Sequence, residues 1–200
     1  MEDPIEYQLE GVNQIAVHNK IGLGFANVLK TILRQDPDII MIGEMRDTET
    51  ARIAVQAALT GHLVLSTLHT NDAISGITRL LDMGVEDYLV TSTVNAVFAQ
   101  RLVRRLCEHC KTEHPDSKGE MVAAGCDQCG HTGYRGRTMI YELFEIDESI
   151  RKLILAQAGT DELRAQARAL GMTTMYECGM RLAAEGVTSR AEVLRVTSGD

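Results

Sequence analysis

The sequence lacks several features that would point directly to a function. None of its 17 glycines is followed by lysine, so the Gly-Lys-Ser/Thr end of a phosphate-binding loop is absent from these 200 residues. Tryptophan is also absent, aromatic residues make up 4% of the chain, and the formal net charge is -8. Nucleic-acid binding needs clustered Lys and Arg with aromatic rings that stack on bases, so we expect no nucleic-acid partner and reject a zinc-ribbon nucleic-acid binder.

Long apolar runs are missing as well. No run approaches the roughly 18 apolar residues that would indicate a membrane-spanning helix, and no signal-peptide pattern opens the chain. We therefore expect a soluble, cytoplasmic protein. The first residues, MEDPIEY, read as the end of a strand and the start of a loop, so we expect that an upstream part of a larger protein is missing.

The pattern over residues 1–106 is that of an α/β sheet domain. A stripe of apolar residues at helical spacing predicts the first helix. Strand, helix and strand then follow at the spacing of a right-handed crossover in a parallel sheet. In order, the pattern predicts a helix over 25–33, a strand over 38–43, a helix over 48–60 ending at Gly61, a strand over 62–67, a helix over 72–82 ending at Gly84, and a helix over 86–106.

The residue composition changes after residue 106. Residues 107–136 are rich in Cys, His, Gly and Asp and predict a loop-rich insert, and 137–200 predict a strand followed by a small helical subdomain. Helix starts are indicated by Asp147, by Thr160 with Asp161, and by a capping box of Ser189 and Glu192. The basic cluster RLVRRLC at 101–107 is interpreted as one face of a helix, solvated or in contact with another subunit.

Two acidic segments are candidates for chemistry. In PDIIMIGEMRD (37–47), Glu44 follows a buried strand and a glycine, and the carboxyl ends of parallel strands are where α/β sheets bind ligands. In EDPIEY (2–7), Pro4 makes a rigid turn that aims Glu6 in one direction. The alternative for Glu6 is an ordinary solvated turn.

Histidine and arginine side chains accompany Glu44. His62 and His69 bracket the next strand, in GHLVLSTLHTND, and either could sense a γ-phosphate or simply bond to a backbone carbonyl. Metal binding by this pair is disfavoured because seven residues of extended strand separate them by roughly 20 Å. Arg34 and Arg46 flank the Glu44 strand and could stabilise charge on a polyphosphate, although Arg34 could instead complement its helix dipole.

The cysteines form the most specific pattern. Two CxxC pairs, separated by fifteen residues, have the spacing of a structural four-thiolate zinc site: Cys107, Cys110, Cys126 and Cys129. Iron, disulfides and redox-active pairs are the alternatives, and a nearby histidine (His109, His114 or His131) could replace one cysteine. Cys178, in a helical segment, is interpreted as a buried apolar residue.

Taken together, these segments resemble one family. EDPIEY, LRQDPDIIMIGEMRD, GHLVLSTLHTNDA, the tetracysteine motif and YELFEI occur in the order found in the ATPases that drive type II secretion and type IV pilus assembly. The resemblance covers essentially the whole chain. It implies part of a RecA-like parallel-sheet ATPase core over 1–106, a zinc-binding insert over 107–136 and a helical subdomain over 137–200.

The resemblance also implies roles for single residues. Glu6 matches the catalytic carboxylate of the aspartate box, which acts on the attacking water, and Glu44 matches the Walker B glutamate, which acts through Mg²⁺ or its water shell. His62 and His69 match the histidine box. Arg34 and Arg46 match basic positions near the nucleotide or the neighbouring subunit.

Since the family's phosphate loop lies upstream of the aspartate box, the resemblance implies that this chain is the carboxyl-terminal part of an ATPase and is inactive by itself. The implied cofactors are ATP, Mg²⁺ and Zn²⁺. The full-length protein would be a homohexamer that works with inner-membrane platform proteins and is peripheral to that membrane through them. Details at both ends favour the secretion branch, and the alternatives are a pilus assembly ATPase or, in isolation, a non-catalytic zinc-stabilised docking module.

Overall fold

The computed structural model describes residues 1–198, and clusters of buried apolar side chains lie in both of its compact units. The first unit comprises residues 1–70, 74–95 and 146–163, and the second comprises 71–73, 96–145 and the segment from 164 onward. The α/β class is confirmed. The domain boundaries at 106 and 136 stay predictions.

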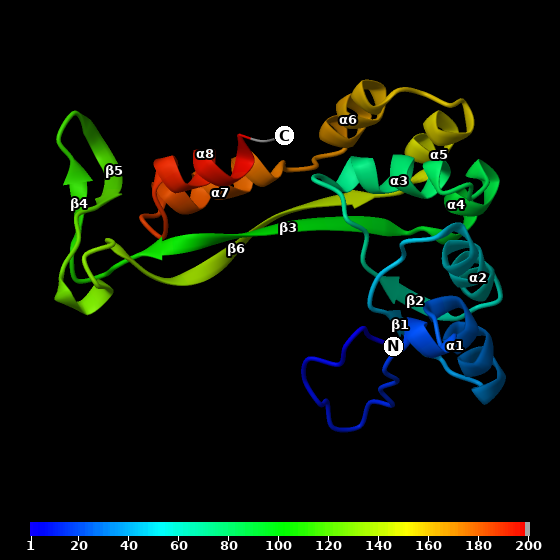
Figure 1. The fold of residues 1–200 in the computed structure, drawn as a ribbon. Helices are drawn as coiled ribbons and strands as arrows, with labels where there is room; N and C mark the ends of the chain where they lie inside the picture. Colours follow the sequence, from blue (N-terminus) through cyan, green and yellow to red (C-terminus); the bar gives the residue numbers. More distant parts are fainter. Residues whose placement is uncertain (199–200) are drawn as a thin grey trace. The chain divides into compact units, whose positions relative to one another are not determined.

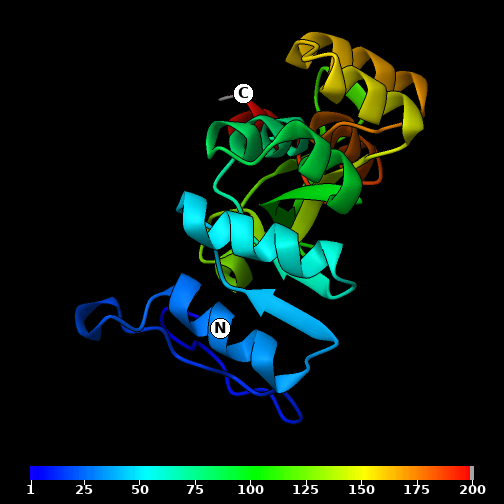
Figure 2. The same ribbon diagram turned by 90° about the vertical axis from the view of Figure 1, so that its right-hand side faces the viewer.

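A two-stranded parallel sheet organises the first unit (Figure 1). Strand β1 (Ile39–Ile42) pairs in register with β2 (Leu63–Ser66), which confirms the predicted parallel arrangement. Helices α1 (Phe25–Ile32) and α2 (Thr48–Leu59) lie next to β1 in Figure 2 and share one core with Ile40 and Ile42. Short 3-10 turns cover Asn19–Ile21 and Leu33–Gln35.

Local signals fix the ends of α2. The Asp47 side chain caps the helix by accepting hydrogen bonds from the backbone N–H and the hydroxyl of Thr50, both at 2.8 Å. Gly61 has φ +104°, a left-handed conformation that favours glycine, and it follows the last helical turn as predicted. The sheet therefore has a helix of defined length between its two strands.

The remaining helices of this unit are α3 (Ala73–Asp82), α4 (Asp87–Thr93), α5 (Glu148–Leu155) and the start of α6 (Thr160–Ala169). Asp147 caps α5 as predicted, by accepting from Ile150 N at 2.9 Å. The amino-terminal residues extend the sheet, because Gly43 N donates to Met1 O at 2.8 Å and Glu2 pairs with Ala16. Among residues 1–198, no helix has the length and apolar character needed to cross a bilayer.

A long antiparallel ribbon organises the second unit. Strand β3 (Ala96–Leu106) pairs with β6 (Tyr134–Glu145), and helices α7 (Met175–Ala184) and α8 (Arg190–Thr197) lie along the ribbon in Figure 1. Val103 and Ile140 are fully buried against Met175 and Cys178 of α7, as expected for Cys178. The segment between the strands holds the hairpin β4 (Lys111–His114) and β5 (Ser117–Ala123) and a 3-10 turn (Asp127–Cys129).

The predicted helix over 86–106 is wrong. Only Asp87–Thr93 is helical, and the basic cluster at 101–107 lies on β3 rather than on a helix. Both faces of β3 carry apolar residues: Val103 points into the core, whereas Phe98 and Leu102 are 48% and 55% exposed. This hides the alternation that would have identified a strand, and the pairing with β6, distant in sequence, decides the conformation.

The predicted capping box at α8 is only half right. Ser189 Oγ accepts from Glu192 N at 3.2 Å, but the Glu192 carboxylate turns to Arg104 and Arg195 instead of the Ser189 backbone. A complete box occurs at α7 between Thr174 and Glu177. The Arg104 and Arg195 guanidinium groups, with the Arg104 backbone N–H, therefore outweigh the local capping preference at the buried Glu192 carboxylate.

Candidate functional site

Glu44 lies just beyond the carboxyl end of β1, where its carboxylate Oε2 accepts two hydrogen bonds. Nε2 of His69 is at 2.8 Å and Nε of Arg46 is at 2.5 Å. The Glu44 side chain is 14% exposed, whereas those of Arg46 and His69 are mostly exposed. The His69 hydrogen bond, assisted by Arg46, lowers the pKa of Glu44, so the carboxyl is ionised at neutral pH.

The next strand fixes the backbone on both sides of Glu44. Thr67 Oγ1 donates to the Gly43 carbonyl at 2.6 Å, and the Thr67 carbonyl accepts from Met45 N at 3.1 Å. Gly43 is needed for close approach, because an added Cβ would lie 3.1 Å from the Met1 carbonyl oxygen. The position of the Glu44 carboxylate is therefore set by hydrogen bonds between strands.

A cleft of about 350 Å³ opens beside Glu44. Two segments supply most of its wall, the residues at the start of α1 and the acidic loop after β1. Its lining residues are Asp3, Gly22, Gly24, Phe25, Ala26, Asn27, Glu44, Arg46, Asp47 and Glu49.

Three of the cleft's carboxylates already have partners. Glu44 is held by His69 and Arg46, Asp47 caps α2, and Glu49 pairs with Lys30 at 2.6 Å. Asp3 has no hydrogen bond or ion pair with another residue of the described chain. Sequence reasoning missed Asp3, although it stands in the same acidic turn as Glu6, directly before Pro4. Asp3 is the carboxylate in this cleft that remains available to a ligand.

Five of the six predicted nucleotide-site residues separate into two groups. Glu44, Arg46 and His69 meet at the carboxyl ends of β1 and β2. Arg34 and His62 stand before the amino ends of these strands, and the His62 ring contacts Ala57 O at 2.9 Å at the end of α2.

Glu6 joins neither group. It is exposed in the loop after Glu2, with no ion pair or hydrogen bond to any residue the structure describes.

The four predicted metal ligands converge in the second unit. Their sulfur atoms all lie within 4.8 Å of one another, and no other such group of His, Cys, Asp or Glu occurs within residues 1–198. The Sγ–Sγ distances are 4.0 Å for Cys107–Cys126 and 3.8 Å for both Cys110–Cys129 and Cys126–Cys129. A tetrahedral Zn²⁺ with Zn–S bonds of about 2.3 Å places its sulfurs roughly 3.8 Å apart, so the four thiols fit this ion.

Backbone N–H groups point at the sulfurs. Gly125 N donates to Cys110 Sγ at 3.3 Å, and Cys126 N and Gly133 N donate to Cys129 Sγ at 3.2 Å. Burial works to raise the pKa of Cys129, but the N–H groups of Cys126 and Gly133, together with the neighbouring thiols, lower that pKa. Burial raises the pKa of Cys110. Donors to sulfur are the arrangement expected around bound thiolates.

Comparisons with known proteins identify the family of the chain. A family model described as "Type II/IV secretion system protein" matches residues 1–195. The chain is 58% identical over 197 residues to the type II secretion system protein HxcR of Pseudomonas aeruginosa, covering 98% of this chain and 41% of that protein. It is 49% identical over 213 residues to the type IV pilus assembly ATPase PilB of Thermus thermophilus, covering 98% and 24%.

Solved structures share the fold of this chain. The pilus retraction motor PilT, solved with ADP bound, matches with a TM-score of 0.73 and 30% identity over 98% of this chain and 51% of its own. The ATPase DotB of Legionella pneumophila matches in fold with a TM-score of 0.68. The chain thus spans only part of the length of its relatives, between 24% and 41% of the two named proteins. Because the family model matches residues 1–195, the chain belongs to the type II/IV secretion system protein family.

Proposed function

We propose that this chain is the carboxyl-terminal part of a hexameric ATPase that powers type II protein secretion, with Glu44 as its central catalytic carboxylate. The observation that carries the proposal is the position of Glu44: an ionised carboxylate at the end of a parallel strand, beside a cleft of about 350 Å³. Family membership supports the same function.

Each nearby residue has a task in ATP hydrolysis. Glu44 would hold Mg²⁺ by way of bound water, and Arg46 and His69, which orient the carboxylate, would sense the γ-phosphate. Magnesium, when bound with ATP, supplies positive charge to the transferring phosphoryl group. Glu6 acts on the attacking water, and Asp3 shares that turn and lies in the cleft, so it is the second candidate for the same role.

The two remaining residues act elsewhere. Arg34, at the amino end of β1, is assigned to the contact with a neighbouring subunit. His62 supports the histidine box by its contact with Ala57 O at the end of α2.

The phosphate-binding loop comes from a part of the protein outside these 200 residues. The sequence has no Gly-Lys-Ser/Thr segment, and electrostatic stabilisation of the phosphates is usually the largest catalytic contribution. In this proposal the whole ATPase is a ring in the cytoplasm that is attached to the inner membrane through platform proteins. The secretion branch is favoured over the pilus branch because HxcR is more similar to the chain than PilB, at 58% against 49% identity.

The tetracysteine group binds Zn²⁺ and has a structural role. Four thiolates complete a tetrahedral site and leave no open position for a substrate. The sulfur spacing and the three N–H donors support this assignment.

Steady-state Mg-ATP hydrolysis tests the proposed division of the site. The purified chain and its Glu44→Gln variant are assayed side by side, and we expect background turnover from both. Turnover by the chain that disappears in the variant would show that a complete phosphate site exists within these residues, and the proposal would fail.

A further inference from the structure

The turn between α7 and α8 is fastened to the end of β3, next to the first metal ligand. Leu106 N donates to Val187 O at 2.9 Å, and Thr188 Oγ1 donates to Arg104 O at 2.8 Å. Lys111, within the insert, donates from Nζ to Gly186 O at 3.3 Å. Cys107 follows directly on this contact, so the turn and the metal site share one stretch of backbone.

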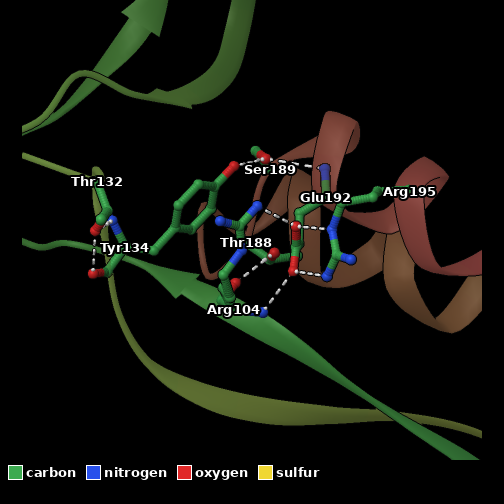
Figure 3. A network of polar contacts seen from close by, with 7 residues as sticks. All are labelled: Arg104, Thr132, Tyr134, Thr188, Ser189, Glu192 and Arg195. Atoms are coloured by element: carbon green, nitrogen blue, oxygen red, sulfur yellow. Dashed lines mark hydrogen bonds and ion pairs between the residues drawn. The ribbon is translucent and has the colours of Figure 1, made fainter.

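A buried carboxylate strengthens the contact (Figure 3). Glu192 of α8 has a side chain that is 0% exposed, and its two oxygens accept from the Arg104 backbone N at 3.1 Å and from Arg104 Nη2 at 2.6 Å. Arg195 adds two hydrogen bonds of 2.8 Å. Two of these four hydrogen bonds come from Arg104 of β3, so displacement of the end of β3 would leave the buried carboxylate short of donors and would weaken the docking of α8.

The start of β6 joins the same network. The Arg104 guanidinium lies 4.1 Å from the centre of the Tyr134 ring, and the Tyr134 hydroxyl hydrogen-bonds to Ser189 Oγ at 2.7 Å. Figure 3 shows the Tyr134 hydroxyl and the Arg104 guanidinium directed toward α8. We call Arg104, Tyr134, Ser189, Glu192 and Arg195 the Glu192 network.

The metal ligands are attached to both strands of this network. Cys107 continues β3, and its N–H donates to Gly133 O at 2.9 Å, while Gly133 N donates to Cys129 Sγ at 3.2 Å. An ion bound by all four thiols therefore ties the end of β3 to the start of β6. Those are the two positions at which Arg104 and Tyr134 hold α8.

We propose that metal binding at the four cysteines and docking of α8 on the β3–β6 ribbon are coupled through the Glu192 network. The metal site thus controls whether α8 and the α7–α8 turn stay docked on the β3–β6 ribbon. The inference rests on the metal-binding part of the proposed function, and no nucleotide chemistry enters it. Coupling between two sites is reciprocal, so undocking of α8 weakens zinc binding by the same factor by which loss of zinc weakens docking of α8.

Zinc affinity provides the first test. The full chain and its Glu192→Gln variant compete with a chromophoric chelator for Zn²⁺, and we expect the variant to bind about 10-fold more weakly or worse, as for residues that support metal ligands. The control is Glu177→Gln on α7, which disrupts an ion pair with Arg168 that has the same 2.6 Å N–O distance but is exposed and does not involve the insert. The zinc affinity of this control should stay unchanged. If Glu192→Gln does not fold, Tyr134→Phe and Thr188→Val are measured instead, with a smaller loss in the same direction.

Hydrogen exchange provides the second test. Removing zinc from the wild-type chain should speed amide exchange over 190–198 and 186–189 before it affects the paired amides of 96–100, with β1 and α2 as internal references. Equal zinc affinities in Glu192→Gln and wild type, or unchanged protection of α8 after zinc removal, would overturn the coupling. A chain that binds no zinc at all would instead refute the metal assignment itself, so the two failures are distinguishable.

Discussion

Glu44 has a largely buried carboxylate whose two hydrogen-bond donors come from exposed side chains. Arg46 is 69% exposed and His69 is 74% exposed. Exposed ion pairs contribute little to stability because water and salt screen them. The arrangement therefore serves to orient the carboxylate at the cleft more than to hold the fold together.

The pH dependence of stability tests this interpretation. The pKa of Glu44 is lowered in the folded chain, so its ion pairs stabilise the fold above the unfolded pKa of about 4.3 and are lost as the pH falls through the folded value. Glu44→Gln should reduce the free energy of unfolding by about 1 kcal/mol or less at pH 7. Urea unfolding should show this gap closing toward pH 3, and a gap that persists there would mean that packing rather than charge is lost.

At the scale of elements, α7 and α8 pack unusually close together at Gly179. A Cβ added at this position would lie 2.6 Å from Val193 Cγ1, and Val193 is fully buried. The glycine thus allows the contact that places Glu192, one residue earlier, against the ribbon.

Gly179→Ala should therefore destabilise the chain by about 1–3 kcal/mol, the usual cost of overpacking. Val193→Ala alone should also destabilise it, by leaving a cavity. The double variant should be more stable than the sum of the two single effects predicts, because each change relieves the other. Strict additivity in urea unfolding would contradict the proposed close contact.

We expect the stability of the insert over 107–136 to depend on the metal site. Structural zinc sites of this kind contribute on the order of 10 kcal/mol in small domains, so chelation should lower the unfolding midpoint of the second unit strongly and leave the first unit little changed. Amide NMR spectra with and without chelator distinguish the two units. Cys126→Ser should behave like the chelated chain and Cys178→Ala like wild type, whereas a metal-free chain of equal stability would refute the assignment.

The sequence predicted correctly the helices and strands whose signals lie within their own segment. Helices α1, α2 and α3 and the parallel strands were identified because their apolar spacing, and the closing Gly61 and Gly84 of α2 and α3, lie within or next to each segment. Strand β3 was missed because its partner β6 is about 40 residues away and its exposed face is apolar. The Glu192 network escaped prediction for the same reason, since Arg104 and Glu192 are 88 residues apart.

The candidate site was predicted only in part. The sequence predicted that Glu44, Arg46 and His69 belong to one site, and the structure brings these three side chains together. The prediction did not separate residues at the amino ends of the strands from those at the carboxyl ends. Arg34 and His62 therefore fall away from Glu44. Asp3 was overlooked because nothing local distinguishes it from the other acids of its turn.

At the scale of the whole molecule, one face of the β1–β2 sheet stays bare. Ile39, Met41, Leu63 and Leu65 are 63%, 56%, 50% and 49% exposed, and the register places Ile39 beside Leu63 and Met41 beside Leu65. Parallel sheets are normally covered on both faces. The chain spans only 41% of HxcR, and we expect another part of the whole protein to cover this face.

A hydrophobic dye reports on that face. The isolated chain should enhance the fluorescence of anilinonaphthalene sulfonate, and the enhancement should fall in a variant with Met41→Thr and Leu65→Thr. Leu155→Thr on α5, another exposed aliphatic position, is the matched control. Equal fluorescence in all three proteins would show that the bare face is not an accessible apolar surface.

The central claim is that Glu44 serves an ATPase whose phosphate loop lies outside this chain. The most direct measurement is Mg-ATP hydrolysis by a chimera in which these residues replace the matching segment of HxcR, assayed beside the same chimera with Glu44→Gln. We predict turnover by the chimera and a loss of about 100-fold or more in kcat for the variant, the contribution typical of a group that supports electrostatic stabilisation of the transition state. Equal turnover by the two chimeras would contradict the catalytic role of Glu44.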